Sequence, residues 1–158
     1  MNFNFINLLI NKHLTISSTE SFTGGLFASE LVKNSGASNY FLGGIISYSV
    51  TSKINILKID SSLIKQFGTI SKQVSKEMAL KGQELFQSDI SISFTGNSGP
   101  NPAENKPTGL FYITIYYKEF FKTFKFETDL NWNRIQIQQY ALECADILLS
   151  NFIQDNIA

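Results

Sequence analysis

The chain has 158 residues, 43% of them hydrophobic, and its 13 basic and 13 acidic residues cancel to a net charge of zero. This size and composition predict a soluble globular chain with a single domain over residues 1–158, and they exclude a disordered or a membrane protein. Because lysine and arginine never gather into a run and no apolar run could span a bilayer, neither nucleic acid nor a membrane is expected as a partner.

In chain order, hydrophobic periodicity predicts a helix over residues 3–12, a strand over 14–18, a helix over 24–33, a strand over 43–50, short helices over 51–57 and 61–66, a helix over 71–86, strands over 89–95, 109–117 and 120–128, and a helix over 132–152. Asp60 and Ser71 are the predicted N-caps of two of these helices. Residues 96–107 hold all three prolines and form a long loop, a usual place for function. We therefore expect one mixed sheet covered by helices on both faces.

Histidine and cysteine each occur once, as His13 and Cys144. Their scarcity excludes an intrachain disulfide, a Cys/His zinc site and a relay of several histidines, so catalysis would have to use hydroxyls, lysine, arginine or carboxylates. We expect Cys144 in the core and His13 at a helix end. The first eleven residues lack the basic start and the cleavage site of a signal peptide, which predicts a cytoplasmic location.

The most informative segment is the turn over residues 19–25, with the sequence T-E-S-F-T-G-G. It combines hydroxyl groups with glycines at a strand-to-helix junction, where α/β enzymes commonly hold their chemistry. The first amides of the following helix are expected to point into this turn and to favour a phosphate or an oxyanion. Gly24 and Gly25 would let a ligand approach the backbone closely.

Polar residues end three predicted strands, at 17–21, 47–53 and 95–100, and such strand ends converge on one edge of a sheet. Ser21 is the best nucleophile candidate, because oxyanion donors could surround it. Its base could be Lys53, if burial leaves the amine neutral near pH 7, or Tyr48, which can relay a proton. Each residue also has a structural interpretation: a helix cap for Ser21, a half-buried strand aromatic for Tyr48 and a solvated side chain for Lys53. The chain has no P-loop and no dinucleotide motif, which argues against an NTPase or a nicotinamide-dependent dehydrogenase.

Five ordered motifs resemble the carboxy-terminal domain of the competence/damage-inducible protein family (CinA), whose stand-alone form is nicotinamide-nucleotide amidase. The family patterns A-E-S-C-T-G-G and F-x-G-G-x-x-x-Y-S-N-x-x-K are similar to residues 19–25 and 41–53. The patterns G-A-V-S, T-G-I-A-G-P and K-P-x-G are similar to residues 68–71, 95–100 and 106–109. The resemblance therefore runs from about Leu14 to the last helix.

This resemblance implies a three-layer α/β/α sandwich with a mixed, mostly parallel sheet, and a homodimer. It implies deamidation of nicotinamide mononucleotide, a small-molecule nucleotide, to nicotinic acid mononucleotide and ammonia in pyridine-nucleotide recycling, with neither a metal nor a cofactor. Ser21 would be the nucleophile, with Tyr48 and Lys53 as proton-transfer partners. Residues expected near the substrate, where hydroxyls, amides and a guanidinium suit a phosphate, are Thr23, Gly24, Gly25, Thr95, Gly96 and Arg134.

The chain departs from the family pattern at four places: Phe22 replaces a cysteine, Val50 an asparagine, Asn97-Ser98 the pair Ile-Ala, and Leu130 an arginine. Two other functions therefore stay open. One is a noncatalytic nucleotide-binding or partner-binding module, and the other is an amidase or esterase for another small substrate. Ammonia release from nicotinamide mononucleotide, compared with a variant that lacks the nucleophile, separates these possibilities.

Overall fold

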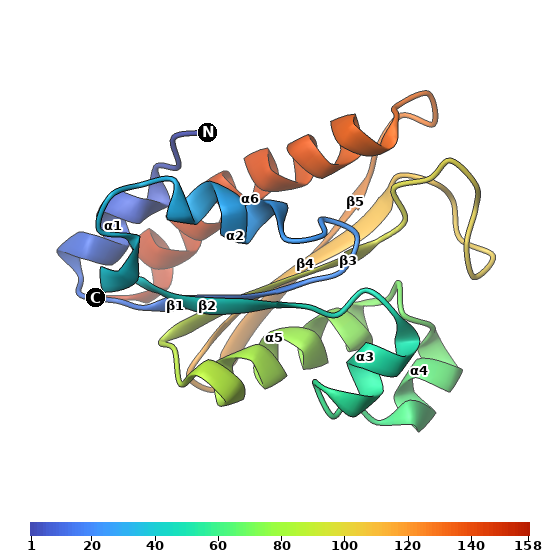
Figure 1. Ribbon diagram of the computed structural model, residues 1–158, viewed down its shortest axis with the longest axis horizontal. Coiled ribbons are helices and arrows are strands. Elements are labelled where there is room, and N and C mark those ends of the chain that lie inside the picture. Colours follow the sequence, from blue (N-terminus) through green and yellow to red (C-terminus); the bar gives the residue numbers. More distant parts are fainter.

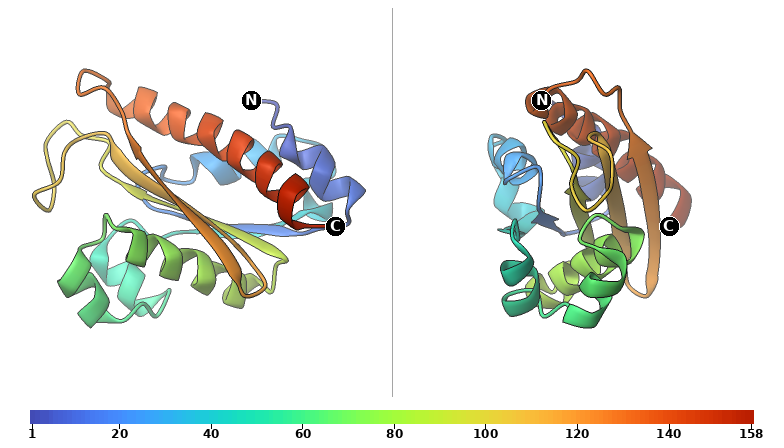
Figure 2. Two further views of the ribbon diagram at one scale, coloured as in Figure 1. Left: turned by 180° about the vertical axis from the view of Figure 1, so that it is seen from behind. Right: turned by 90° about the vertical axis from the view of Figure 1, so that its right-hand side faces the viewer.

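The computed structural model describes residues 1–158 and places one five-stranded sheet between two layers of helices (Figure 1). The elements are α1 (Phe5–Asn11), β1 (Ile16–Glu20), α2 (Leu26–Val32), the 3₁₀ turn η1 (Ala37–Asn39), β2 (Phe41–Ile46), α3 (Val50–Asn55), α4 (Ser61–Phe67), α5 (Lys72–Phe86), β3 (Ile90–Gly96), β4 (Leu110–Tyr117), β5 (Phe120–Glu127) and α6 (Arg134–Asn156). Helices α1, α2 and α6 cover one face of the sheet, and α3, α4 and α5 lie on the other (Figure 2). The predicted α/β/α layering is confirmed. None of the helices is both long and apolar enough to cross a membrane.

The strand order is β2-β1-β3-β4-β5. Strand β1 pairs in parallel with β2 and β3, whereas β4 pairs antiparallel with β3 and β5. Strand β5 therefore runs in the same direction as β1, β2 and β3, and β4 alone opposes them. The predicted mixed, mostly parallel sheet is confirmed, and the β4–β5 hairpin supplies its two antiparallel pairings.

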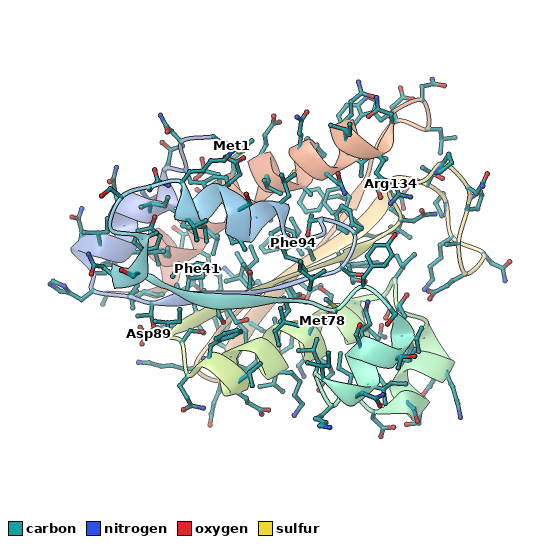
Figure 3. The ribbon with its side chains drawn as sticks, in the orientation of Figure 1. Met1, Phe41, Met78, Asp89, Phe94 and Arg134 are labelled. Atoms are coloured by element: carbon teal, nitrogen blue, oxygen red, sulfur yellow. The ribbon has the colours of Figure 1, made fainter.

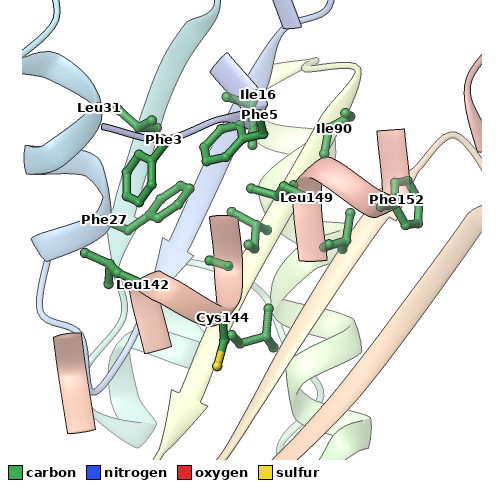
Figure 4. Packing of buried hydrophobic residues seen from close by; sticks show 14 of the residues in the cluster. Phe3, Phe5, Ile16, Phe27, Leu31, Ile90, Leu142, Cys144, Leu149 and Phe152 are labelled. Atoms are coloured by element: carbon green, nitrogen blue, oxygen red, sulfur yellow. The ribbon is translucent and has the colours of Figure 1, made fainter. Parts of the chain in front are cut away.

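The two faces of the sheet differ in chemistry. The face toward α1, α2 and α6 is apolar, and side chains such as Phe27 and Leu149 interdigitate there over Ile16 and Ile90 (Figure 4). Cys144 is buried in this core, as predicted. Since the core accounts for most of the buried apolar surface, this face contributes the larger part of the hydrophobic stabilisation.

The opposite face presents hydroxyls to α5. Thr19 Oγ1 donates to the Met78 carbonyl at 3.0 Å, and Ser93 Oγ donates to the Ser75 carbonyl at 2.6 Å. Helix α5 packs closely because it carries Gly82, where a Cβ atom would lie only 2.7 Å from Thr19 Cγ2. Alternation of side chains along each strand thus gives the same strands an apolar face and a hydroxyl face.

The ends of the elements decide where the polar residues lie. Asp60 and Ser71 cap α4 and α5, as predicted, and His13 lies just beyond the end of α1. The strand predicted over residues 43–50 occupies Phe41–Ile46 instead, because Ser49 begins α3 with a capping box. This earlier end puts residues 47–53 in a turn and a helix beyond the sheet, so they can fold back over its edge.

Candidate active site

The ends of β1 and β3, the turn after β2 and the start of α6 enclose a cavity of about 420 Å³. Figure 3 shows Arg134 at this edge of the sheet, beside the long loop that follows β3. The cavity brings together five of the residues predicted from the sequence, namely Ser21, Tyr48, Thr95, Gly96 and Arg134. Thr23, Gly24 and Gly25 do not line it.

Lys53 lies directly behind Ser21. Its Nζ atom is 2.9 Å from Ser21 Oγ, 2.6 Å from the Ser47 carbonyl oxygen and 3.5 Å from the Tyr48 carbonyl oxygen. Only 1% of Lys53 is exposed, and its ammonium forms no ion pair. Burial lowers the pKa of Lys53 to about 8, although the charge of Glu104 acts in the opposite direction. The amine can therefore lose its proton at mildly alkaline pH.

Tyr48 occupies a different position from Lys53. Its side chain lines the cavity but is 62% exposed, and its hydroxyl forms no hydrogen bond within the protein. The Tyr48 carbonyl, rather than its phenol, faces the Lys53 amine. Of the two candidate bases, Lys53 is the one that contacts Ser21 directly.

The start of α2 is occupied by a carboxylate of the protein itself. Glu20 is 1% exposed, and its oxygens accept hydrogen bonds from the amides of Gly25 at 3.0 Å, Phe27 at 3.2 Å and Ala28 at 2.9 Å. The predicted anion site at this helix start is therefore corrected, because an internal carboxylate takes the place of a bound phosphate. The left-handed conformations of Gly24 and Gly25, with φ of 61° and 95°, instead shape the turn that carries Ser21.

Two amides beside Ser21 remain available. The backbone N–H groups of Phe22 and Thr23 donate to no group of the protein, whereas the Ser21 and Gly24 amides bond to carbonyls. An amide directly after a serine nucleophile is the usual position of an oxyanion donor. Phe22 is therefore the residue to examine for oxyanion stabilisation.

The loop between β3 and β4, residues 97–109, forms a large part of the cavity wall. At its start, Arg134 donates to Ser98 Oγ at 2.8 Å and to the Gly99 carbonyl. Further along, Thr69 and Ile70 donate to the Glu104 carboxylate. Glu104 and Thr69 line the cavity without having been named from the sequence, whereas Ser98 belongs to the predicted polar segment 95–100. Only the unusual length of the loop could have pointed to Glu104.

The model of the CinA C-terminal domain family matches residues 1–152. The chain belongs to this family. A putative competence-damage inducible protein of Listeria monocytogenes serotype 4a is 41% identical over 131 residues, which cover 80% of the chain but 31% of the Listeria protein. The chain thus spans less than a third of the length of that CinA-family relative.

A relative of similar length is Protein MG115 of Mycoplasma genitalium, which is 39% identical over 133 residues, 82% of the chain and 83% of that protein. The fold matches the crystal structure of competence damage-inducible protein A from Klebsiella pneumoniae with a TM-score of 0.92, at 21% identity and with 96% of the chain and 93% of that structure covered. This likeness shows that the α/β/α architecture is that of the CinA-family structure.

The departures from the CinA pattern have local explanations. The Phe22 ring is buried against Phe111, with their centroids 5.4 Å apart, so it extends the core. Val50 and Leu130 are exposed and line no part of the cavity. The Asn97 side chain donates to the Asn101 carbonyl and accepts from the Gly99 amide, and so braces the β3–β4 loop. None of these residues forms a hydrogen bond with Ser21 Oγ or Lys53 Nζ.

Proposed function

We propose that the chain is a serine amidohydrolase that converts nicotinamide mononucleotide to nicotinic acid mononucleotide and ammonia. The observation that carries the proposal is the 2.9 Å contact between Ser21 Oγ and the buried amine of Lys53. A neutral amine has two protons and one lone pair. With its protons directed to the carbonyls of Ser47 and Tyr48, the lone pair faces the Ser21 hydroxyl and can accept its proton.

In the first half of the reaction, Ser21 Oγ attacks the carboxamide carbon while its proton passes to Lys53 Nζ. The carbonyl oxygen gains negative charge, and on this proposal the amide of Phe22, which has no acceptor within the protein, stabilises it. The tetrahedral intermediate then breaks its carbon–nitrogen bond, and the leaving nitrogen takes the proton back from Lys53. Ammonia departs and Ser21 remains as an ester.

In the second half, a water molecule attacks the ester carbon and gives a proton to Lys53. The bond to Ser21 Oγ breaks, the oxygen recovers that proton, and the carboxylic acid product ionises as it leaves. The two halves balance without a redox step or an added co-reactant. Lys53 acts as base and then as acid in each half, which a pKa of about 8 permits near neutral pH.

The polar groups of the cavity support a phosphate-bearing carboxamide as substrate. Arg134 is the only cationic residue on the wall, and a guanidinium can bind a phosphate through paired donors. Thr95 Oγ1 donates its proton to the Thr69 carbonyl at 2.7 Å, so toward the cavity it can only accept hydrogen bonds. An acceptor beside Ser21 suits the N–H groups of a carboxamide.

The decisive experiment measures ammonia and nicotinic acid mononucleotide formed from nicotinamide mononucleotide by the whole chain and by Ser21→Ala. We expect the wild type to form both products in equal amounts and the variant to form neither. Equal inactivity of the two proteins would overturn the proposed function. In that case, binding of the nucleotide measured by calorimetry would favour the noncatalytic binding module.

A further inference from the structure

Glu104 is the only carboxylate on the wall of the cavity. Its Oε1 atom accepts hydrogen bonds from the Thr69 amide at 2.9 Å and from Thr69 Oγ1 at 2.6 Å, and its Oε2 atom accepts one from the Ile70 amide at 3.1 Å. The two segments lie 35 residues apart in the sequence. Glu104 therefore fastens the β3–β4 loop to the turn between α4 and α5.

This attachment continues to a residue of the proposed substrate site. The Thr69 carbonyl accepts the Thr95 hydroxyl at 2.7 Å, so all three polar groups of Thr69 are engaged, two by Glu104 and one by Thr95. The side-chain torsion of Thr95 consequently depends on where Glu104 holds Thr69. Since the carboxylate already accepts three hydrogen bonds, Glu104 is better placed to orient the wall than to bind a ligand.

The negative charge of Glu104 also bears on the buried ammonium of Lys53. Lys53 is buried without an ion pair, and Glu20, the nearest carboxylate in sequence to Ser21, is saturated by the amides of α2. Among the cations, Lys106 lies 3.6 Å from Glu104 Oε2 and donates to the Phe67 carbonyl, while Arg134 is held by Ser98. Glu104 is thus the only carboxylate on the wall that also holds Ser21, whose Oγ contacts Lys53 Nζ.

We propose that Glu104 is a positioning residue, which orients Thr95 through Thr69 and supplies the negative charge that favours the ammonium form of Lys53. The inference rests on the proposed function for the catalytic part of Lys53, but its electrostatic part can be measured without turnover. Burial lowers the pKa of Lys53, and the charge of Glu104 acts in the opposite direction.

The test follows the titration of Lys53 by NMR in the whole chain labelled with ¹³C-lysine, with Lys53→Met used to assign the signal. In Glu104→Gln, which keeps the size of the side chain and removes its charge, we expect the midpoint of Lys53 to fall by about 0.5 pH unit or more. In Thr69→Val, which removes one hydrogen bond and keeps the charge, the midpoint should stay at the wild-type value. Glu119→Gln, in the distant hairpin turn, is the matched control and should also leave it unchanged.

An unchanged midpoint in Glu104→Gln, or an equal fall in Thr69→Val, would overturn the assignment. If Glu104→Gln fails to fold because its amide group meets the Ile70 N–H, Glu104→Ala replaces it, since water can then reach the exposed turn. Its midpoint is judged in the same way.

Kinetics supply the positioning part of the test. The acid limb of kcat/KM should move to lower pH in Glu104→Gln, whereas Thr69→Val should lower kcat without moving the limb. If Thr69→Val has wild-type kcat, Thr95 does not depend on this attachment and the positioning role is wrong. A wild-type chain that releases no ammonia would overturn the proposed function alone, because the NMR titration still decides the role of the Glu104 charge.

Discussion

Lys53 Nζ and Ser21 Oγ lie 2.9 Å apart, although 32 residues separate them in the sequence. Ser21 follows β1 and Lys53 lies in α3, the helix after β2, and these two strands are parallel neighbours. Because parallel strands end at the same edge of a sheet, the two side chains meet above that edge. The geometry depends on the early end of β2 at Ile46, which leaves room for the Ser49 cap and for the first turn of α3.

Removal of the Lys53 amine should abolish turnover and increase stability. In Lys53→Met we expect kcat to fall by about 10³-fold or more, because Ser21 loses its base. At pH 7 the variant should unfold at a higher temperature, because wild-type folding buries an ammonium without an ion pair. Calorimetric melting and ammonia release measure the two effects, and a less stable Lys53→Met would contradict the electrostatic explanation.

The pH dependence of turnover should follow Lys53. Burial lowers the pKa of Lys53 from 10.5 to about 8, and only the neutral amine can accept the Ser21 proton. We therefore expect kcat/KM to rise with pH and to level off above a midpoint near pH 8. A rate that is flat between pH 6 and 9 would show that another group is the base.

The same pKa shift determines how stability changes with pH. Between pH 8 and pH 10.5 the unfolded chain holds the Lys53 proton and the folded chain has lost it, so the free energy of unfolding should rise with pH. Below this window both states are protonated and the contribution of Lys53 is constant and unfavourable. Urea unfolding of wild type and Lys53→Met at pH 7.5 and 9.5 tests this, and the rise attributable to Lys53 should vanish in the variant.

Several features of the site were predictable because they depend on local sequence. The hydroxyl-rich turn at Ser21 and the polar residues after the second strand are visible in the sequence, and parallel topology brings them together. The role of Glu20 was missed because the first strand ends two residues later than its apolar pattern indicates, which places this carboxylate against α2. The end of β1 is set by its pairing with β2 and with β3. The register of these pairings cannot be derived from the sequence of β1 alone.

The contacts of the β3–β4 loop could not be predicted from the sequence either. Its prolines and glycines predict irregular structure, but they do not fix the path that brings Glu104 to Thr69 and Ser98 to Arg134. These contacts join segments more than 30 residues apart and depend on side chains at single positions. Sequence periodicity carries information about regular elements and none about such contacts.

Arg134 should determine affinity for the phosphate. In Arg134→Met we expect KM for nicotinamide mononucleotide to rise about 10- to 100-fold, the equivalent of losing a charge-assisted hydrogen bond or two, with a smaller change for nicotinamide riboside. Ser98→Ala is the matched control, since it removes one contact that holds the guanidinium and leaves its charge in place. Equal losses with both substrates would show that Arg134 acts only by bracing the β3–β4 loop.

Glu20 should contribute stability through the start of α2. Glu20→Ala leaves three amides without their acceptor in a buried turn, and we expect the free energy of unfolding to fall by about 2 kcal/mol. Chemical unfolding measures this change. Glu127→Ala is the control, because its pair with Lys125 is exposed on β5 and should contribute less than about 0.5 kcal/mol. Similar values for the two variants would contradict the capping role of Glu20.

Gly82 tests the close packing of α5 on the hydroxyl face. Alanine is the better helix former by about 1 kcal/mol, so propensity alone predicts that Gly82→Ala stabilises the protein. Its Cβ atom, however, would lie 2.7 Å from Thr19 Cγ2 and 2.8 Å from Ser91 Oγ, both on strands that cannot move without disturbing the sheet. We therefore expect a net loss of about 1–2 kcal/mol in the free energy of unfolding, and a lower kcat because β1 carries Ser21 at its end.

Lys81→Ala, one residue earlier and paired only with Glu84 at the surface, should change neither quantity. A Gly82→Ala variant more stable than the wild type would show that helix propensity outweighs contact with the sheet at this position.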